Sequence, residues 1–322
     1  MTKMVLDIKD LSLSFTTGES IVSILQEINL KIYAGEVVGL VGESGSGKSV
    51  TALAISKLLP ENITHFTNGS INFDGINILD SSEQEVAKLR GKRIGFVFQE
   101  PMTALNPTMT IGNQLFHVIR RHSNLSKSES RVQVRKSLEE VLIANPEIVE
   151  NYYPFQLSGG MRQRVVIAMA MSANPSLLIA DEPTTALDVT VQAEILSLIT
   201  KLAQNHGTAV LLISHDLGVI ANTCSKVTVM YAGEVVENGA VADVLKSPKH
   251  PYTQALIKSL PDIATRGSIL ETISGEFPDL RNRPAGCIYS PRCDKKFDKC
   301  VISPELVSLE NDQQVACWLV EK

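Results

Sequence analysis

The eight residues GESGSGKS at 42–49 constrain the fold more than any other part of the sequence. They match the phosphate-loop pattern G-x-x-x-x-G-K-[ST] at every fixed position. Glycines allow the backbone to curl into a nest of N–H groups that face phosphate oxygens, and the start of a following helix adds its positive dipole end. GEVVGLVG before the loop predicts a buried strand, and SVTALAISKLL after it has helical apolar spacing. This order predicts an α/β protein with a phosphate site.

Each residue of this loop is a candidate for binding the phosphates of a nucleotide. The set is Gly42, Glu43, Ser44, Gly45, Ser46, Gly47, Lys48 and Ser49. We expect the Lys48 ammonium to reach the β- and γ-phosphates and the Ser49 hydroxyl to ligate Mg²⁺. A glycine-rich connecting loop is the alternative, and the strand and helix on either side argue against it.

A second apolar strand ends in two carboxylates. SLLIADEP places Asp181 and Glu182 at the C-terminal end of this strand, where ligands gather in open α/β sheets. Asp181 suits a Mg²⁺ partner, directly or through water, and Glu182 suits a general base that polarises the attacking water. A solvated turn is the alternative for such a pair. Together with the phosphate loop, the pair predicts nucleotide hydrolysis.

Three further segments extend the expected nucleotide site. FQLSGGMRQR puts Ser158, Gly159 and Gly160 at the start of an apolar helix, which makes a second helix end able to hold phosphate. Gln99 follows the apolar run GFVF and could reach the metal, and His215 ends the strand AVLLIS and could touch the γ-phosphate. A polar loop residue and a neighbour of a helix cap are the structural alternatives for these last two. Two phosphate-binding helix ends suggest that two copies meet around nucleotide.

In order, GESGSGKS, the glutamine of VFQEP, LSGGMRQ, LLIADE, ALD at 186–188 and the histidine of ISHD resemble the motifs of ABC transporter nucleotide-binding subunits. The resemblance covers about the first 240 residues. It implies an ABC-type P-loop ATPase domain over 1–240, with a RecA-like core, an antiparallel β subdomain and a helical subdomain that carries the signature LSGG. It also implies ATP and Mg²⁺ as cofactors.

The same resemblance assigns roles to residues. The loop 42–49 of one subunit would face the signature residues 158–160 of another across ATP, with Asp188 at the dimer seam. Phe15 resembles the aromatic that stacks on adenine, and a core phenylalanine in the strand LSLSF is the alternative. Because Glu182 and His215 are both present, we expect a hydrolytically competent subunit.

Helical spacing dominates between Ile111 and Ala144. Val134, Leu138, Val141 and Leu142 are expected to line one apolar face of a helix. By resemblance this region is the helical subdomain, and the loop at Gln99 is the hinge where such subunits meet a membrane pore.

Composition and the end of the chain narrow the type of ABC protein. The interval between the phosphate loop and LSGG is too short for the long coiled coils of chromosome-maintenance ATPases, and no apolar run approaches the roughly 20 residues of a membrane span. The first ten residues lack an apolar stretch, so we expect no secretory signal. The net charge of −5 argues against nucleic acid as a partner.

The segments HPYTQALIKSLP, ISGEFPDL, GCIYSPRC and VAC resemble the C-terminal extension of oligopeptide and dipeptide importer ATPases, whose relatives also import nickel. We place this extension at 241–322. Phe155 departs from that group, which usually has histidine there. The resemblance implies a subunit that hydrolyses ATP to power peptide import, and nickel or metal-chelate import is the alternative. It further implies a peripheral position on the cytoplasmic face of the membrane, a paralogous ATPase in a heterodimer, two permease subunits and an external substrate-binding protein.

Four of the five cysteines lie at 287–317: Cys287, Cys293, Cys300 and Cys317. A reducing cytosol disfavours disulfides, and the tight C-x₂₋₄-C pairs of zinc sites are absent. An iron–sulfur cluster tolerates wider spacing, and by resemblance a 4Fe–4S cluster is expected, with zinc, or reduced cysteines that pack the extension, as alternatives. Arg292 and Lys295 could offset the charge of such a cluster, and solvated surface residues are the alternative. A redox-sensing regulatory ATPase is the functional alternative that this set raises, and Cys224 is expected to be a core residue.

Overall fold

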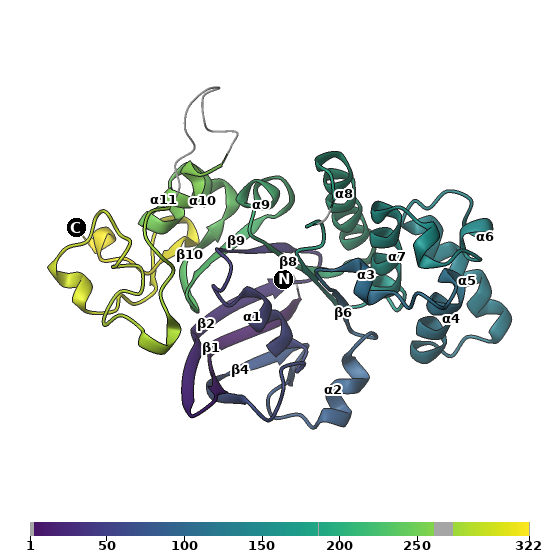
Figure 1. Cartoon of the computed structure of the whole chain (residues 1–322), viewed down its shortest axis with the longest axis horizontal. Coiled ribbons are helices and arrows are strands. Elements are labelled where there is room, and N and C mark those ends of the chain that lie inside the picture. Colours follow the sequence, from purple (N-terminus) through teal and green to yellow (C-terminus); the bar gives the residue numbers. More distant parts are fainter. Residues whose placement is uncertain (1–2, 186, 261–272, 322) are drawn as a thin grey trace. The chain divides into compact units, whose positions relative to one another are not determined.

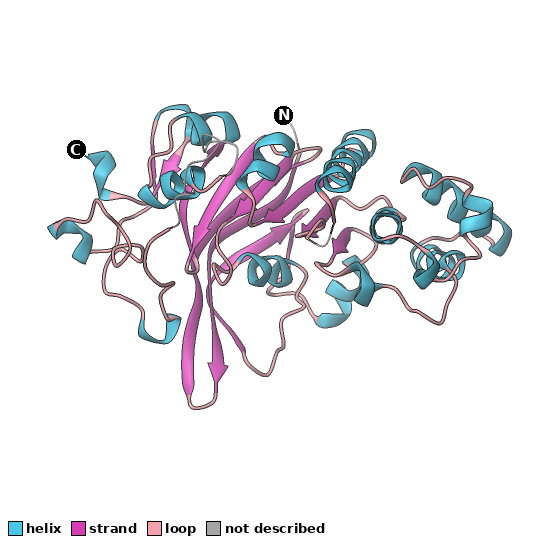
Figure 2. Ribbon diagram, turned by 45° about the horizontal axis from the view of Figure 1, so that its top comes forward, coloured by secondary structure: helices cyan, strands magenta, loops and turns pink. Residues whose placement is uncertain are grey.

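The computed structural model describes residues 3–185, 187–260 and 273–321 and shows a mixed α/β fold (Figures 1 and 2). These residues form two compact units. The first contains Met1–Val5, Ile32–Val37 and Ser81–Ile213, and the second contains Leu6–Lys31, Val38–Asp80 and Ser214–Lys322. Residue 240 lies inside the second unit, so this division does not test the domain boundary predicted there.

Parallel strands form the centre of the first unit. β7 (Leu177–Asp181) lies between β6 (Ile94–Val97) and β8 (Ala209–Ser214), and both neighbours run parallel to it. Every residue of β7 and β8 is buried. A strand of a parallel sheet is covered on both faces, which explains why these segments are continuously apolar in the sequence.

Helices make up the rest of the first unit. They are α2 (Glu83–Leu89), α3 (Pro101–Ala104), α4 (Ile111–His122), α5 (Lys127–Glu140), α6 (Pro146–Val149), α7 (Gly159–Met171) and α8 (Val189–His206), with a 3₁₀ turn at Pro154–Gln156. α4 and α5 pack against each other, and α7 packs against β6 and α8.

The expected apolar face of α5 is right except at its end. Val134, Leu138 and Val141 are buried, but Leu142 is 65% exposed. The helix ends at Glu140, and Leu142 has a left-handed φ of 59°. The prediction for Leu142 was wrong because the backbone reverses there and carries its side chain off the helical face.

Two sheet regions belong to the second unit. One has the order β2 (Ser20–Tyr33), β1 (Met4–Thr17), β4 (Thr64–Phe73) and β5 (Ile76–Asn77), and β1 pairs with β4 antiparallel. In the other, β3 (Val37–Val41) is parallel to β9 (Lys226–Tyr231), which is antiparallel to β10 (Glu234–Ala240). The helices of this unit are α1 (Lys48–Ile55), α9 (Leu217–Thr223), α10 (Val241–Lys246) and α11 (Pro251–Lys258). None of the described helices is long and apolar enough to cross a membrane.

The C-terminal extension continues the second of these sheet regions. β12 (Gln314–Val315) pairs with β10, and β11 (Val307–Ser308) pairs with β12. Among the described residues of the extension, short 3₁₀ turns lie at Leu280–Asn282, Asp298–Val301 and Trp318–Glu321, and a further turn with a left-handed residue lies at Glu310–Asp312. The extension therefore adds an antiparallel edge to a sheet that also carries the strand before the phosphate loop.

A buried carboxylate fastens the extension to β10. Glu237 is fully buried, and its oxygens accept hydrogen bonds from the backbone N–H groups of Lys249 and His250 and from Gln313 Nε2, at 2.8, 3.0 and 2.7 Å. A buried charge is tolerated only when it is paired or hydrogen-bonded. The three donors come from the turn before α11 and from the tail, so this carboxylate joins both to the sheet.

The imidazole of His250 is buried beside the same turn. Its Nδ1 accepts a hydrogen bond of 3.0 Å from the backbone N–H of Tyr252 and thereby caps α11. Burial lowers the pKa of His250 to about 3. The neutral ring is the form that fits, because a proton on Nδ1 would remove the acceptor.

This buried histidine predicts a loss of stability in acid. Below pH of about 6.5 the unfolded chain protonates His250 and the native chain does not, so the free energy of unfolding falls as pH falls, by up to about 1.4 kcal/mol per pH unit. His250→Asn keeps a capping side chain but does not titrate. Unfolding midpoints measured between pH 7.5 and 4.5 should therefore fall more steeply for the native protein than for this variant, and parallel profiles would contradict the assignment.

Candidate functional site

The phosphate loop joins β3 to α1, as the sequence predicts. Gly47 is the N-cap of α1 with a left-handed φ of 102°. At Gly42 a Cβ atom would lie 2.1 Å from the carbonyl oxygen of Met230. Glycine is needed at the first position because β9 passes too close for any side chain, and at Gly47 because of the backbone conformation.

Lys48 lies inside the curve of its own loop. Its side chain is buried, and Nζ donates hydrogen bonds of 2.8 and 2.9 Å to the carbonyl oxygens of Gly42 and Glu43. Ser49 follows in the first turn of α1 and is exposed. A buried ammonium at the start of a helix, beside an exposed hydroxyl, suits a bound phosphate and its metal ion.

The carboxylate pair lies at the end of β7, in the first unit. Asp181 is the last residue of the strand and is buried. Carboxylate oxygens are among the hard donors that Mg²⁺ prefers, so a buried carboxylate at the end of a strand is a candidate metal ligand.

Glu182 has a strained backbone and a fixed side chain. Its φ is 45°, which costs a non-glycine residue on the order of 1 kcal/mol. Its carboxylate Oε2 accepts hydrogen bonds from Gln99 Nε2 at 3.0 Å and from Thr185 Oγ1 at 2.9 Å. Two residues that were predicted separately, Gln99 and Glu182, are thus in contact, because β6 and β7 are parallel neighbours whose carboxyl ends meet.

Thr185 is a site residue that the sequence reasoning missed. It lies in the turn EPTT, three residues after Glu182, and its hydroxyl also bonds the Glu182 carbonyl oxygen at 3.1 Å. Serine and threonine commonly make such local bonds to the backbone. The spacing in the sequence could have found it.

The signature residues start α7. Ser158 is the N-cap and accepts a hydrogen bond of 3.3 Å from the N–H of Met161. A Cβ on Gly160 would lie 2.7 Å from Val191 of α8, so glycine permits the close approach. Asp188 caps α8 by accepting from the N–H of Val191 at 3.0 Å. Within one chain Asp188 therefore has a structural role, and its place at a dimer seam stays a prediction; Ala186 of the same motif lies outside the described residues.

His215 and Phe15 belong to the second unit. His215 is exposed directly after β8, and Phe15 is half-buried in β1 opposite Thr64. Their contacts with nucleotide stay predictions.

The four cysteines of the extension come near one another but do not form a recognisable metal site. The N–H of Cys287 bonds the carbonyl oxygen of Cys300 at 3.0 Å. Burial raises the pKa of Cys287 to about 11, and the neighbouring Cys300, Cys317 and Cys293 add to this rise. All five cysteines, Cys224 included, are free thiols.

Across residues 3–185, 187–260 and 273–321, no group of three or more His, Cys, Asp or Glu side chains is arranged to hold a metal ion. The iron–sulfur prediction is therefore not supported. The guanidinium of Arg292 pairs with Glu43 of the phosphate loop, and its role in offsetting the charge of a cluster stays a prediction.

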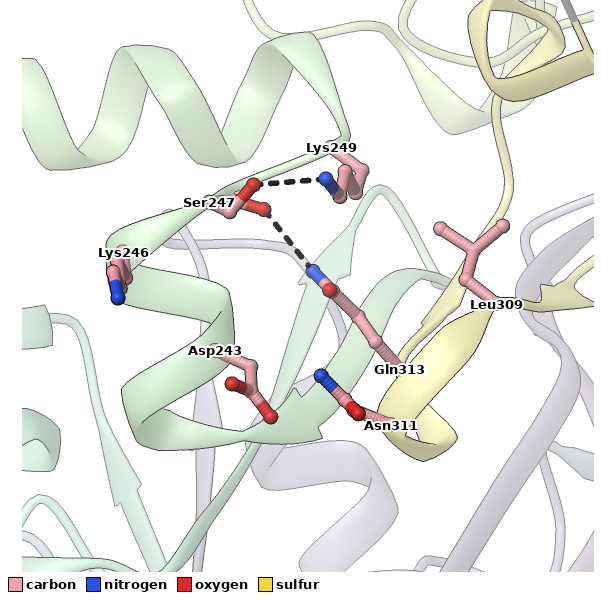
Figure 3. A pocket seen from close by; sticks show the side chains of 7 residues that line it. All are labelled: Asp243, Lys246, Ser247, Lys249, Leu309, Asn311 and Gln313. Carbon is pink, nitrogen blue, oxygen red and sulfur yellow. Dashed lines mark hydrogen bonds between the residues drawn. The ribbon is translucent and has the colours of Figure 1, made fainter.

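A separate pocket of about 420 Å³ lies within the second unit (Figure 3). Its lining combines two lysines with acidic, amide and hydroxyl side chains: Asp243, Lys246, Ser247, Lys249, Leu309, Asn311 and Gln313. Two hydrogen bonds join lining residues to one another. Lys249 Nζ donates to Ser247 Oγ at 2.8 Å, and Gln313 Nε2 donates to the Ser247 carbonyl oxygen at 3.4 Å. None of its residues belongs to the nucleotide motifs.

Known structures share the fold. A chain described as a dimeric post-hydrolysis state of the ATP-binding cassette MJ0796 bound to ADP and Pi aligns with a TM-score of 0.65 at 32% identity, over 73% of this chain and 98% of that one. CbiO1 from Clostridium perfringens aligns with a TM-score of 0.67 at 28% identity, over 76% and 92%.

Residues 25–185 match the family described as ABC transporter. The chain therefore belongs to the ABC transporter family of ATP-binding proteins, whose cassettes hydrolyse ATP. Residues 236–300 match the oligopeptide/dipeptide transporter C-terminal region.

Curated relatives extend over almost the whole chain. The probable D,D-dipeptide transport ATP-binding protein DdpD of Escherichia coli is 48% identical over 99% of this chain and 97% of its own length. The oligopeptide transport ATP-binding protein OppD of Bacillus subtilis is 45% identical over 98% and 88%. The similarity thus includes the extension as well as the ATPase domain.

The geometry at Glu182 yields a direct prediction. Glu182→Gln keeps the side-chain size but removes the base, so ATP binding should persist while turnover falls by about 10²–10⁴-fold. Glu139→Gln, an exposed position on α5, is the matched control and should hydrolyse ATP normally. Phosphate release and nucleotide binding measured on both variants check this, and unchanged turnover in Glu182→Gln would remove it as the base.

Proposed function

We propose that this chain is the ATP-hydrolysing subunit that powers the import of dipeptides or oligopeptides through a membrane ABC transporter. The observation that carries the proposal is the match of residues 236–300 to the oligopeptide/dipeptide transporter C-terminal region, joined to an ATPase domain with its loop lysine and carboxylates in place. Relatives named for dipeptide and oligopeptide transport support peptides over nickel as cargo.

In this proposal the chain has an ATPase domain at 1–240 and an importer-type extension at 241–322. The beginning of the second family match, at residue 236, and the strands that the extension adds beside β10 support this division.

In this proposal the residues have the roles in hydrolysis that the resemblance to ABC ATPases implies. The loop 42–49 binds the phosphates through backbone N–H groups and Lys48, with Phe15 against the adenine. Ser49, Gln99 and Asp181 would hold Mg²⁺, which when bound neutralises charge on the β- and γ-phosphate oxygens. Glu182 takes a proton from the attacking water, and His215 contacts the γ-phosphate. Gln99 and Thr185 orient the Glu182 carboxylate, so they fix the direction of the base.

Partners follow from the same proposal. Ser158, Gly159 and Gly160, of which the first two are exposed, would complete the nucleotide site of a second ATPase subunit, a paralogue of this chain, with Asp188 at the seam. Two permease subunits would receive the motion at the loop around Gln99, on the cytoplasmic face of the membrane, and an external binding protein would deliver the peptide. Nucleic acid has no part in it.

The proposal is tested in the assembled transporter. ATP hydrolysis should rise by about tenfold or more when permeases and a peptide-loaded binding protein are both present, because only then does the cargo signal reach the ATPase. Nickel-loaded binding protein is the matched comparison. A rate indifferent to permeases and binding protein would reject an importer function and favour a regulatory ATPase.

A separate proposal concerns the metal that the four cysteines of the extension would bind. Four thiols are the right donor set for a 4Fe–4S cluster or for zinc, and all four lie within residues 287–317 of the extension. The lack of ligand geometry among the described residues stands against it, so no step of the ATPase runs through such a group. Its function would be to hold the extension together or to sense redox state.

Metal content decides between these cysteine roles. Protein purified without oxygen should be brown and contain about four iron atoms per chain if a cluster is present. Cys300→Ser should then lose iron, whereas Cys224→Ser, at a half-buried cysteine outside the extension whose pKa burial raises to about 12, should retain it. A colourless protein free of iron would reject the cluster, with zinc content separating a zinc site from packed thiols.

A further inference from the structure

The C-terminal extension makes a bidentate ion pair with the phosphate loop. Arg292 lies against Glu43, the second residue of the loop, with Nη1 2.6 Å from Oε2 and Nη2 3.2 Å from Oε1. Two N–H···O bonds between flat groups fix orientation as well as distance. The Arg292 side chain is 5% exposed and that of Glu43 is 28% exposed. The guanidinium is therefore shielded from water, which weakens surface ion pairs, whereas the carboxylate keeps partial access to solvent.

Arg292 is itself held in place on every nitrogen. Nε donates to the Ser274 carbonyl oxygen at 2.9 Å, Nη2 also donates to that of Ile273 at 3.2 Å, and Nη1 also donates to the Tyr231 hydroxyl at 3.3 Å. A guanidinium with this many fixed partners loses little further freedom when it binds a carboxylate. The pair is rigid, so it can hold the loop in one position.

The backbone of Glu43 has two further restraints. Its N–H donates a 2.8 Å hydrogen bond to the hydroxyl of Tyr252, which is fully buried in α11 of the extension. Its carbonyl oxygen accepts from Lys48 Nζ. The extension therefore holds the side chain and the N–H of the same residue whose carbonyl bonds the phosphate-binding lysine.

The aromatic ring of Phe277, a residue of the extension, lies beside Gly45 of the phosphate loop. A Cβ built on Gly45, which has a left-handed φ of 84°, would be 3.4 Å from Phe277 Cε1. The same ring packs against Tyr231, with the centroids 5.3 Å apart. Glycines give the loop little conformational preference of its own, so these outside contacts restrict the shapes it can take.

The charges of Arg292 and Glu43 also affect the binding of ATP. An ionised carboxylate inside a phosphate loop repels the triphosphate, and a neighbouring guanidinium cancels most of that repulsion. We propose that Arg292 is a positioning residue for ATP binding: it neutralises and fixes Glu43, so that the C-terminal extension sets the phosphate affinity of the loop.

The test compares KM and kcat for ATP in the assembled transporter, together with equilibrium ATP binding by the purified full-length chain. Arg292→Gln should raise KM about tenfold and leave kcat within about twofold, because the charge that opposes ATP is exposed while Glu182 is untouched. Arg292→Lys, which keeps the charge but loses the fork, should raise KM by no more than about threefold.

Two further variants separate charge from folding. Glu43→Gln/Arg292→Gln removes both charges and should recover most of the affinity lost in Arg292→Gln. Arg281→Gln is the matched control, because Arg281 makes a bidentate pair with Asp279 in the same extension but is exposed and bonded only two residues away. Its KM should equal that of the native protein.

An unchanged KM in Arg292→Gln would overturn the proposal, as would a loss of kcat alone or a double variant that binds no better than the single one. If Arg292→Gln does not fold, the neutral pair is compared with the native chain: ATP binding within about threefold supports the proposal, and binding more than about tenfold weaker overturns it. The inference rests on ATP binding at 42–49, which is part of the proposed function, and not on peptide transport. If the native chain binds no ATP, both the proposed function and the role of Arg292 are rejected. If every variant binds ATP equally well, only the role of Arg292 is rejected.

Discussion

The phosphate loop can work only while its N–H groups face inward, and a segment rich in glycine does not keep that shape unaided. The protein supplies the shape from several sides. Lys48 bonds the loop carbonyls from within, Met230 of β9 lies against Gly42, and the N–H of Gly233 bonds the Ser46 carbonyl oxygen at 2.9 Å. Packing around the loop, more than the loop itself, determines its conformation.

The carboxylate site depends on a different constraint, the alignment of parallel strands. β6 and β7 end at the same edge, and this brings Gln99 and Glu182 into hydrogen-bond contact from positions 83 residues apart. The left-handed backbone at Glu182 adds local strain, which the bond from its N–H to Ile213 holds in place. Strain at a residue with a fixed side chain is common at functional sites.

The C-terminal extension is attached to the sheet and also contacts the phosphate loop. Glu237 and the strands β11 and β12 attach it to the sheet beside the phosphate loop, while Arg292 and Tyr252 reach Glu43. Arg292 directly precedes Cys293 in the chain. Any change in the conformation of the cysteine segment therefore acts on a backbone that is one residue away from a group bonded to the loop.

The sequence motifs predict the positions of several residues of the nucleotide site. Lys48 inside its loop, Ser158 at a helix start and Asp181 at a strand end lie where the sequence predicts them, since each is decided by a few consecutive residues. The prediction failed where the backbone turns, as at Leu142, whose left-handed φ the helical pattern does not reveal.

The sequence by itself determined the class of protein and the chemistry of its ATP site, because a nest of N–H groups, a cap or a strand end is built within one short segment. Only the tertiary structure decided what supports that site. Contacts of this kind are the hydrogen bond from Thr185 to Glu182, the cap that Asp188 makes on α8 and, above all, the ion pair of Arg292 with Glu43 across 249 residues. Their partners are selected by how strands and turns pack, and no local pattern encodes which distant carboxylate a buried arginine will meet.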